Sequence, residues 1–200
     1  MNGPRPQPRR LSHFLAASAL VAAFAPAFGG CSEPAPLIPR GAWAVQFVRP
    51  DNKCKHTNHN LGIGEVTATT RQTLIEDGAE DTVVGCSVID NGGSFYFDAN
   101  ASNKVGNALT MIVPELAADA SIDAPAIGTV SYLSTSNTAT TFSSDKCNFY
   151  FEDGTPQAVS AGNIFVAFDC PEIAAAIDDV CQIQKGYAVF ENCSSKNDSE

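Results

Sequence analysis

The chain has 200 residues, with 12 Lys and Arg against 22 Asp and Glu, which gives a formal charge of −10 at pH 7. This acidic balance argues against nucleic acid as a partner, because phosphate backbones call for clustered Lys and Arg. It also argues against electrostatic adhesion to anionic lipid. The sequence contains no phosphate loop, dinucleotide fingerprint, His-Glu-x-x-His or Gly-x-Ser-x-Gly motif, so it lacks these common signatures of nucleotide binding and hydrolysis.

The first 30 residues have the pattern of an export signal. Arg5, Arg9 and Arg10 precede an uninterrupted run of twelve apolar and small residues, 14–25, which ends at a proline. A membrane-spanning helix needs about 20 apolar residues. A signal peptide needs a positive start, an apolar stretch of about 7 to 15 residues and small residues at the cleavage site. We therefore assign residues 1–30 to a signal peptide.

The sequence "AFGGC" closes this segment. It resembles the lipobox of bacterial lipoproteins, in which small residues precede a cysteine that is lipidated and becomes the first residue of the mature chain. Gly29 and Gly30 supply the small residues and Cys31 the acceptor, while Phe28 stands where lipoboxes usually have Leu, Val or Ile. The resemblance implies acyl chains such as palmitate on Cys31. The alternative is an ordinary signal peptide cut nearby, which would leave Cys31 as an unpaired thiol.

Cleavage before Cys31 removes three of the twelve basic residues and none of the 22 acidic ones, and so moves the formal charge from −10 to −13. Membrane attachment then depends on the lipid, at about 0.8 kcal/mol per buried CH₂. Ser32 follows the cysteine, in place of the aspartate that often retains such lipoproteins at the inner membrane. The resemblance therefore implies an outer-membrane lipoprotein that faces the periplasm or the cell surface.

The remaining chain divides into three parts. Three prolines favour an extended spacer, so residues 31–40 are predicted to form a Pro-rich tether. Residues 41–193 are long enough for one core and too short to suggest two, and are predicted to form a single domain. The polar segment 194–200 is predicted to be a flexible tail.

Short runs rich in β-branched and aromatic residues, separated by Gly, Asp, Asn, Pro and Ser clusters, predict strands in the domain. Nine runs are expected: Ala42–Val48, Gly64–Thr70, Thr82–Ile89, Ser94–Ala99, Ala108–Val113, Gly128–Ser134, Cys147–Glu152, Asn163–Cys170 and Gly186–Glu191. Pro171–Val180 is the one expected helix, with proline in a first turn and alanines inside. The pattern predicts an all-β fold, an antiparallel β-sandwich or jelly-roll-like domain with one short helix, stabilised by disulfides.

Alternation within these runs predicts part of the core. Phe149 and Phe151 share one face of their strand and are expected to be buried. Asn163–Cys170 is apolar on both faces, as in a strand covered on both sides. Trp43, the only tryptophan, shares its parity with Val45 and is expected to be a core anchor rather than a platform for a ligand.

Cysteine number points to an oxidising compartment. Without Cys31, the chain keeps an even set that can pair completely: Cys54, Cys86, Cys147, Cys170, Cys181 and Cys193. Such a set after an export signal implies a disulfide framework, each bridge worth about 2 to 4 kcal/mol. The alternative is a zinc site, but no Cys-x-x-Cys occurs. The expected pairs are Cys170–Cys181, Cys54–Cys86 and Cys147–Cys193, and an extended strand keeps Cys181 from Cys193.

Two loops carry candidate metal ligands. "CKHTNHN" places His56 and His59 three residues apart, and imidazoles are common ligands of zinc, copper and nickel. "IEDGAED" gathers carboxylates that could bind calcium, namely Glu76, Asp77, Glu80 and Asp81. The preferred interpretations are a polar surface loop and a solvated acidic turn, so neither is assigned as a metal site and no cofactor is predicted.

Four motifs in the second half, "GTVSY", "CNFYF", "FVAFDCP" and "FENC", are structural in character. With them the sequence resembles secreted or lipid-anchored β-sandwich proteins of myxobacteria, a class with no assigned activity. We expect a non-catalytic cell-envelope protein that binds a protein, glycan or other envelope partner. The alternative is a hydrolase with a carboxylate-based or metal-assisted site. The Ser- and Thr-rich segment Thr135–Ser144 is either a recognition loop or a polar connection.

Replacement of the expected lipid acceptor tests the assignment. Cys31→Ser is expected to abolish lipid labelling and to release the protein from membrane pellets, while the domain still folds because no expected disulfide uses Cys31. Metabolic labelling with a palmitate analogue and mass spectrometry of the mature amino terminus provide the measurement. An unmodified Cys31 in the mature wild-type protein would contradict the lipoprotein assignment.

Overall fold

A computed structural model describes residues 37–135 and 140–196 of the chain, which belong to one compact unit that starts at Pro36. Cys31, the assigned signal peptide and most of the tether lie outside the described residues. The described part is built almost entirely from antiparallel strands, as the sequence predicts. None of its helical residues forms a segment with the length and hydropathy needed to cross a bilayer.

The strands follow one another with short connections. In chain order they are β1 Arg40–Val48, β2 His59–Ile63, β3 Glu65–Val66, β4 Arg71–Thr73, β5 Ile75–Glu76, β6 Val83–Asp90, β7 Ser94–Ser102, β8 Ala108–Ala117, β9 Ala126–Ser134, β10 Thr140–Tyr150, β11 Ala158–Ser160, β12 Asn163–Ala176 and β13 Asp179–Glu191. Eight of the nine predicted runs fall in long strands. Gly64–Thr70, the ninth, contributes only β3, while β2 was not expected.

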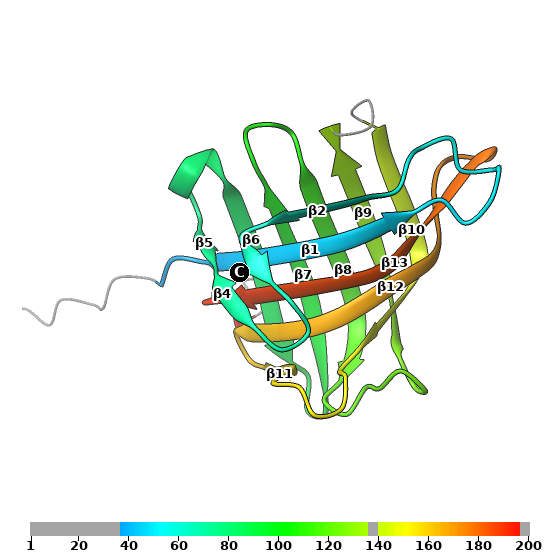
Figure 1. Cartoon of the computed structure of the whole chain (residues 1–200). Helices are drawn as coiled ribbons and strands as arrows, with labels where there is room; N and C mark the ends of the chain where they lie inside the picture. Colours follow the sequence, from blue (N-terminus) through cyan, green and yellow to red (C-terminus); the bar gives the residue numbers. More distant parts are fainter. Residues whose placement is uncertain (1–36, 136–139, 197–200) are drawn as a thin grey trace, which may run out of the picture. The chain divides into compact units, whose positions relative to one another are not determined.

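One continuous sheet connects the long strands in the order β2-β1-β13-β12-β10-β9-β8-β7-β6. The sheet is strongly curled, so that β2, β1, β13 and β12 cross in front of β6 to β10 (Figure 1). The antiparallel all-β class is thus confirmed. The finer description as a sandwich or jelly roll remains a prediction.

Breaks in strand pairing accompany the curl. The register shifts between Ser144 and Cys147 in β10, and between Phe168 and Cys170 and again between Cys170 and Ile173 in β12. Such bulges bend a strand and increase its twist. They lie midway along the two strands that link the front and rear parts of the sheet, where a bend is required.

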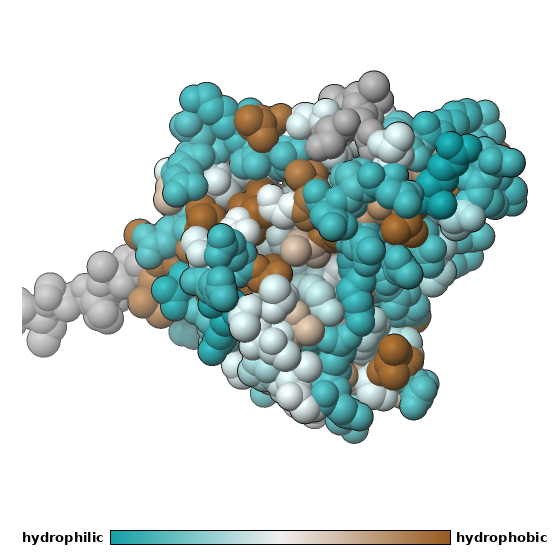
Figure 2. Space-filling view, in the orientation of Figure 1, coloured by the Kyte–Doolittle hydropathy of each residue, from teal (hydrophilic) through white to brown (hydrophobic). Residues whose placement is uncertain are grey.

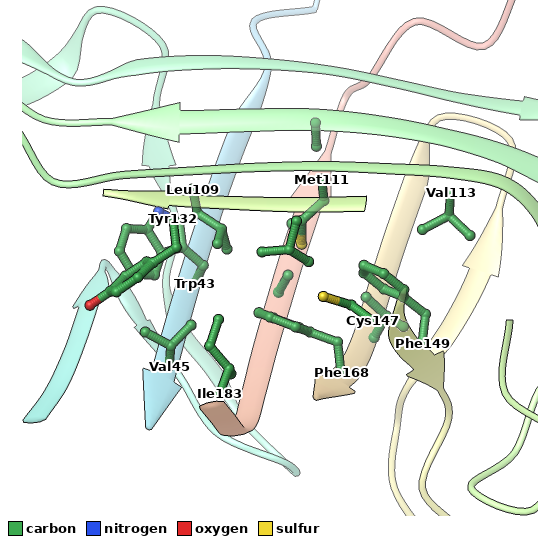
Figure 3. Close-up of a cluster of buried hydrophobic side chains, with 14 of the residues drawn as sticks. Trp43, Val45, Leu109, Met111, Val113, Tyr132, Cys147, Phe149, Phe168 and Ile183 are labelled. Atoms are coloured by element: carbon green, nitrogen blue, oxygen red, sulfur yellow. The ribbon is translucent and has the colours of Figure 1, made fainter. Parts of the chain in front are cut away.

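The main core fills the space inside the curl. Trp43 and Phe47 of β1 meet Tyr132 of β9, with ring centroids 6.1 and 5.6 Å from Tyr132, and Phe149 stacks on Phe168 at 5.6 Å. Figure 3 shows Trp43, Tyr132, Phe149 and Phe168 converging from the crossing strands. Trp43 is fully buried, as predicted, and its indole Nε1 has no hydrogen-bond partner among the described residues.

Other expected core positions behave as predicted. Phe149 is fully buried, and Phe151 is partly buried against the core. The run Ile164–Phe168 of β12 is buried throughout, and Phe165 packs in a second apolar cluster with Ala42, Val66 and Val189. This strand is therefore covered on both faces.

The predicted helix is wrong. Pro171–Val180 forms the end of β12, a two-residue turn and the start of β13, and the described residues contain no α-helix, only 3₁₀ residues such as the short turn Ala79–Asp81. Ile173 and Cys181 pair across this hairpin and are both buried. Their burial in the main core outweighs the local preference of the alanines for a helix. Pro171 is tolerated because it lies where the register shifts between Cys170 and Ile173, and bulges are positions at which sheets accept proline.

All six cysteines of the domain form disulfides, but the three expected pairs are wrong. The bonds join Cys54 to Cys181, Cys86 to Cys193, and Cys147 to Cys170. Cys181 and Cys193 are not joined to each other, in agreement with the reach argument.

The helix assignment caused one of these errors. In the hairpin, Cys170 pairs in register with Ile183 and Cys181 with Ile173, so the two cysteines are not opposite each other. The other two errors have a tertiary origin, because the curl brings the ends of distant strands together. Cys193 follows β13, and the adjacent Ser194 exchanges backbone hydrogen bonds with edge strand β6 at Cys86 and Val88.

Gly186 tests the packing at the curl. A Cβ at this position would lie 2.3 to 2.7 Å from three atoms of the fully buried Phe168 ring. Gly186→Ala is expected to lower the free energy of unfolding by about 1–3 kcal/mol, because the core must shift to admit the methyl group. Denaturant unfolding of the oxidised protein measures the loss.

Gly85→Ala is the matched control. Its Cβ would meet only the exposed side-chain amide of Asn100, at 3.0 Å. Equal stability of the two variants would contradict the proposed packing role of Gly186.

Candidate functional site

A two-stranded ribbon, β3 and β4, lies over the outer face of the sheet, outside the main core. Gly64 joins β2 to this ribbon with φ 69°, and a Cβ there would lie 2.3 Å from the Thr73 carbonyl oxygen. The residue must be glycine because the chain turns sharply at a close approach of two backbones. The ribbon and the sheet enclose the second apolar cluster, where Val66 packs with Ala42 and Val189.

Polar contacts hold the ribbon in place. Glu191 of β13, whose side chain is 13% exposed, accepts hydrogen bonds from Arg40 of β1 and from Arg71 of β4, at 2.6 and 2.7 Å. The side-chain amide of Gln157 donates to the Ala68 carbonyl at 3.0 Å. The ribbon is thus tied to the sheet at one point and to the loop after β10 at another.

An open groove of about 770 Å³ runs between the ribbon and strands β1, β2 and β13. Ala44, Gly62 and Tyr187 form its floor, and they are neighbours in register on the three strands. Val66 and Thr70 of the ribbon segment line the opposite side. In the space-filling view of this face, hydrophobic residues lie among hydrophilic ones where the ribbon meets β1 (Figure 2).

A polar row borders the floor. Asn60, Gln46 and Lys185 are in register on β2, β1 and β13 and all line the groove. Gln72 of β4 completes the polar lining from the ribbon. The side-chain amides of Gln46, Asn60 and Gln72 are exposed and have no hydrogen-bond partner among the described residues. Amides in this state can offer donors and acceptors to a bound molecule without breaking an internal bond.

Lys185 is held in an ion pair beside the groove. Its ammonium group donates to Glu152, whose carboxylate also accepts from the Gln157 amide at 3.3 Å and from the Tyr187 hydroxyl at 3.4 Å. The hydrogen bond to Glu152 raises the pKa of Lys185 despite partial burial, and burial raises the pKa of Tyr187. Lys185 therefore stays charged and Tyr187 neutral at physiological pH, and both side chains are fixed in position.

The two histidines considered as candidate metal ligands, His56 and His59, have different partners in the structure. His56 Nε2 lies 3.0 Å from Asp179 Oδ2, whereas His59 Nε2 lies 2.7 Å from the Tyr132 hydroxyl oxygen. The two rings serve different partners, and His59 packs against Phe47 with centroids 4.8 Å apart. The sequence predicted an exposed polar loop, but both rings lie against the core.

Two carboxylates of the acidic segment Ile75–Asp81 have partners in the structure. Asp77 accepts from the backbone N–H of Val84 at 2.9 Å, and Asp81 pairs with Lys104 at 2.9 Å. Within the described residues, its carboxylates form no group of three candidate metal ligands. The segment is thus a structured acidic turn.

Sequence reasoning missed the residues of the groove. Asn60 and Gln72 belong to short polar segments with no strand signal, and Gln46 is a single polar residue within an apolar run. The one usable signal was the alternation within β1, which places Gln46 on the face opposite to that of Val45 and Phe47. The candidate recognition segment Thr135–Ser144 is described only in part, and Thr140–Ser144 belong to β10.

Comparisons with protein-family models, curated proteins and solved structures give no significant match. The resemblances to bacterial lipoproteins and to myxobacterial envelope proteins therefore remain predictions.

Tyr132 provides a test of the interior arrangement. Burial raises the pKa of its hydroxyl to about 12, and a hydrogen bond with Ser134 reduces this effect. The pKa of Tyr132 in the folded protein lies above its unfolded value of about 10. The contribution of the neutral Tyr132 hydroxyl to folding stability is therefore complete below about pH 10. This contribution is lost as the pH rises through about 12 and the hydroxyl ionises. Burial also raises the pKa of Tyr96, Tyr150 and Tyr187, and alkaline titration followed by phenolate absorbance should show Tyr132 ionising last.

Tyr132→Phe is expected to remove this last ionisation step. Tyr96→Phe is the control, because Tyr96 is partly exposed and lies on a different strand, β7. Ionisation of all the tyrosines in one step near pH 10, in a protein that is still folded, would contradict the burial of Tyr132.

Proposed function

We propose that this protein is a lipid-anchored, non-catalytic component of the cell envelope, and that its outer groove binds a neutral glycan. The observation that carries the glycan proposal is the row of unpaired amides beside a tyrosine floor. Sugars present many hydroxyl groups that both donate and accept, which matches amide side chains. They also present apolar C–H faces, which can lie against the ring of Tyr187.

Charge favours a neutral ligand. The one basic side chain among the described lining residues, Lys185, is already paired with Glu152. Glu65 adds a negative charge to the lining, and the whole chain is acidic. An anionic glycan would therefore meet repulsion with no free cation to offset it.

The hydrolase alternative receives less support from the groove. Glycosidases typically place two carboxyl groups on either side of the scissile bond. Among the described residues that line the groove, Glu65 is the single acidic one, and none is a histidine or a cysteine. The lining therefore suits recognition better than acid–base catalysis.

The envelope location rests on two supports. The amino-terminal segment resembles a lipoprotein signal with Cys31 as acceptor, and the three disulfides suit an oxidising compartment outside the cytoplasm. The proposed anchor would hold the domain at the outer membrane, on its periplasmic or outer side, through acyl chains such as palmitate.

The groove is tested with an array of neutral oligosaccharides, followed by calorimetric titration of the strongest binder. Gln46→Ala/Asn60→Ala is expected to weaken its affinity about tenfold or more, because each lost hydrogen bond contributes about 0.5–1.5 kcal/mol. Both side chains are exposed, so the substitutions should leave stability nearly unchanged.

Gln184→Ala/Asn100→Ala is the matched control, because both residues are exposed and neither lines the groove. Its affinity should equal that of the wild type. Failure of the wild-type domain to bind any neutral oligosaccharide, or unchanged affinity in Gln46→Ala/Asn60→Ala, would contradict the proposal.

A further inference from the structure

A second group of chemically active side chains lies where the β12–β13 hairpin meets the loop between β1 and β2. The ligand-capable atoms of Cys54, Asp179 and Cys181 all lie within 4.8 Å of one another, and all three residues are buried. It is the single such group of three or more His, Cys, Asp or Glu residues in the described part of the chain. None of the three lines the groove.

The carboxylate is positioned toward both the sulfur atoms and an imidazole. Asp179 Oδ1 lies 3.8 Å from Cys181 Sγ and accepts a hydrogen bond from the Lys55 backbone N–H at 3.0 Å. Asp179 Oδ2 lies 3.0 Å from His56 Nε2. The side chains of His56 and Asp179 are only 11% and 10% exposed. A nearly buried carboxylate and two sulfur atoms therefore share one small volume, and the imidazole of His56, which lies outside this group of three, contacts the second oxygen of the same carboxylate.

The disulfide is the main tie between these two segments. The residues at the tip of the β1–β2 loop, 51–53, are exposed, and Asp51 and Asn52 accept hydrogen bonds from Arg49 and Lys53 of the same loop. Apart from Cys54–Cys181, the loop reaches the hairpin through Asp179 and through the exposed ion pair of Lys55 with Asp178. Cys54 is fully buried and His56 packs against Phe142, with ring centroids 4.9 Å apart, so a reductant reaches the disulfide when the loop opens locally from its exposed tip.

We propose that reduction of the Cys54–Cys181 disulfide converts this cluster into a zinc site whose ligands are Cys54, Cys181, Asp179 and His56. Two molecules of a small thiol supply the two electrons: their sulfurs join as a disulfide, and their two protons pass to Cys54 and Cys181. Zinc then binds the two thiolates and releases both protons to solvent. This proposal is independent of the glycan-binding proposal.

The chemistry of the donors fits zinc. Zn²⁺ prefers four tetrahedral ligands drawn from thiolate, imidazole and carboxylate, with Zn–S bonds of about 2.3 Å. Two thiolates on one such ion lie about 3.8 Å apart. The two sulfur atoms, which are bonded to each other in the disulfide, must therefore separate when the ion enters. The exposed β1–β2 loop that carries Cys54 can accommodate this movement.

The other two disulfides lack these neighbours. Cys147–Cys170 connects β10 and β12 inside the core, and Cys86–Cys193 connects β6 to the segment after β13. Neither pair belongs to a group of three candidate ligands among the described residues. They provide internal controls for any effect that depends only on free thiols.

The first experiment uses wild-type protein and no variant. The protein is reduced with a water-soluble phosphine, which becomes the phosphine oxide by taking oxygen from one water as the two thiols form. It is then alkylated with iodoacetamide in the presence or absence of zinc. Mass spectrometry is expected to show that zinc slows alkylation of Cys54 and Cys181 at least tenfold and leaves Cys86 and Cys193 unchanged. No protection, or equal protection of all six cysteines, would overturn the proposal.

The second experiment tests the ligand set with Cd²⁺, which reports thiolate binding through charge-transfer absorption. Reduced wild-type protein should bind one Cd²⁺ per chain at this site, whereas the oxidised protein should show no such band. Asp179→Asn and His56→Phe are each expected to weaken binding at least tenfold, while Asp178→Asn, on the exposed neighbouring carboxylate, should not change it. Unchanged affinity in both Asp179→Asn and His56→Phe would overturn the assigned ligand set.

Discussion

The bend in the long strands is the constraint on which the rest of this domain depends. A single antiparallel sheet has one extended apolar face, and it can bury that face only by folding back on itself. The bulges in β10 and β12 provide the bend, and the Cys147–Cys170 disulfide joins the two strands beside it. The stacked pair Phe149 and Phe168 comes from the same two strands. The core inside the curl follows from this arrangement.

The curl also decides what lies outside the sheet. Because the inner face of β1 and β13 is filled by the core, their outer face remains available, and the β3–β4 ribbon covers only part of it. The uncovered part becomes the groove floor. The network from Lys185 through Glu152 and Gln157 to Ala68 connects the floor to the ribbon, so the ribbon backbone and the Lys185 side chain are held in place. Such preorganisation limits the entropy lost when a ligand binds.

Two disulfides hold segments outside the central strands in place, and the residues around the two bonds differ. Cys86–Cys193 holds the segment after β13 along edge strand β6, where Ser194 continues the hydrogen bonding of the edge. An edge protected in this way is less available for pairing with another chain. Cys54–Cys181 instead lies beside Asp179, at an exposed loop, where the same sulfur atoms have polar neighbours. The surroundings, more than the bond itself, distinguish the two disulfides.

The sequence by itself determined the local features of this protein: the positions of eight long strands, the buried Trp43 and Phe149, and the presence of a complete disulfide set. These follow from alternation, β-branched and aromatic content and an even number of cysteines, all of which are local or countable. The tertiary structure decided the pairing of the cysteines, the hairpin at Pro171–Val180 and the groove residues. Each of these depends on which distant strands the curl brings together. Gln46, Asn60 and Lys185 are up to 139 positions apart in the numbering yet adjacent in register, because strand pairing, and not sequence distance, sets the neighbours on a sheet.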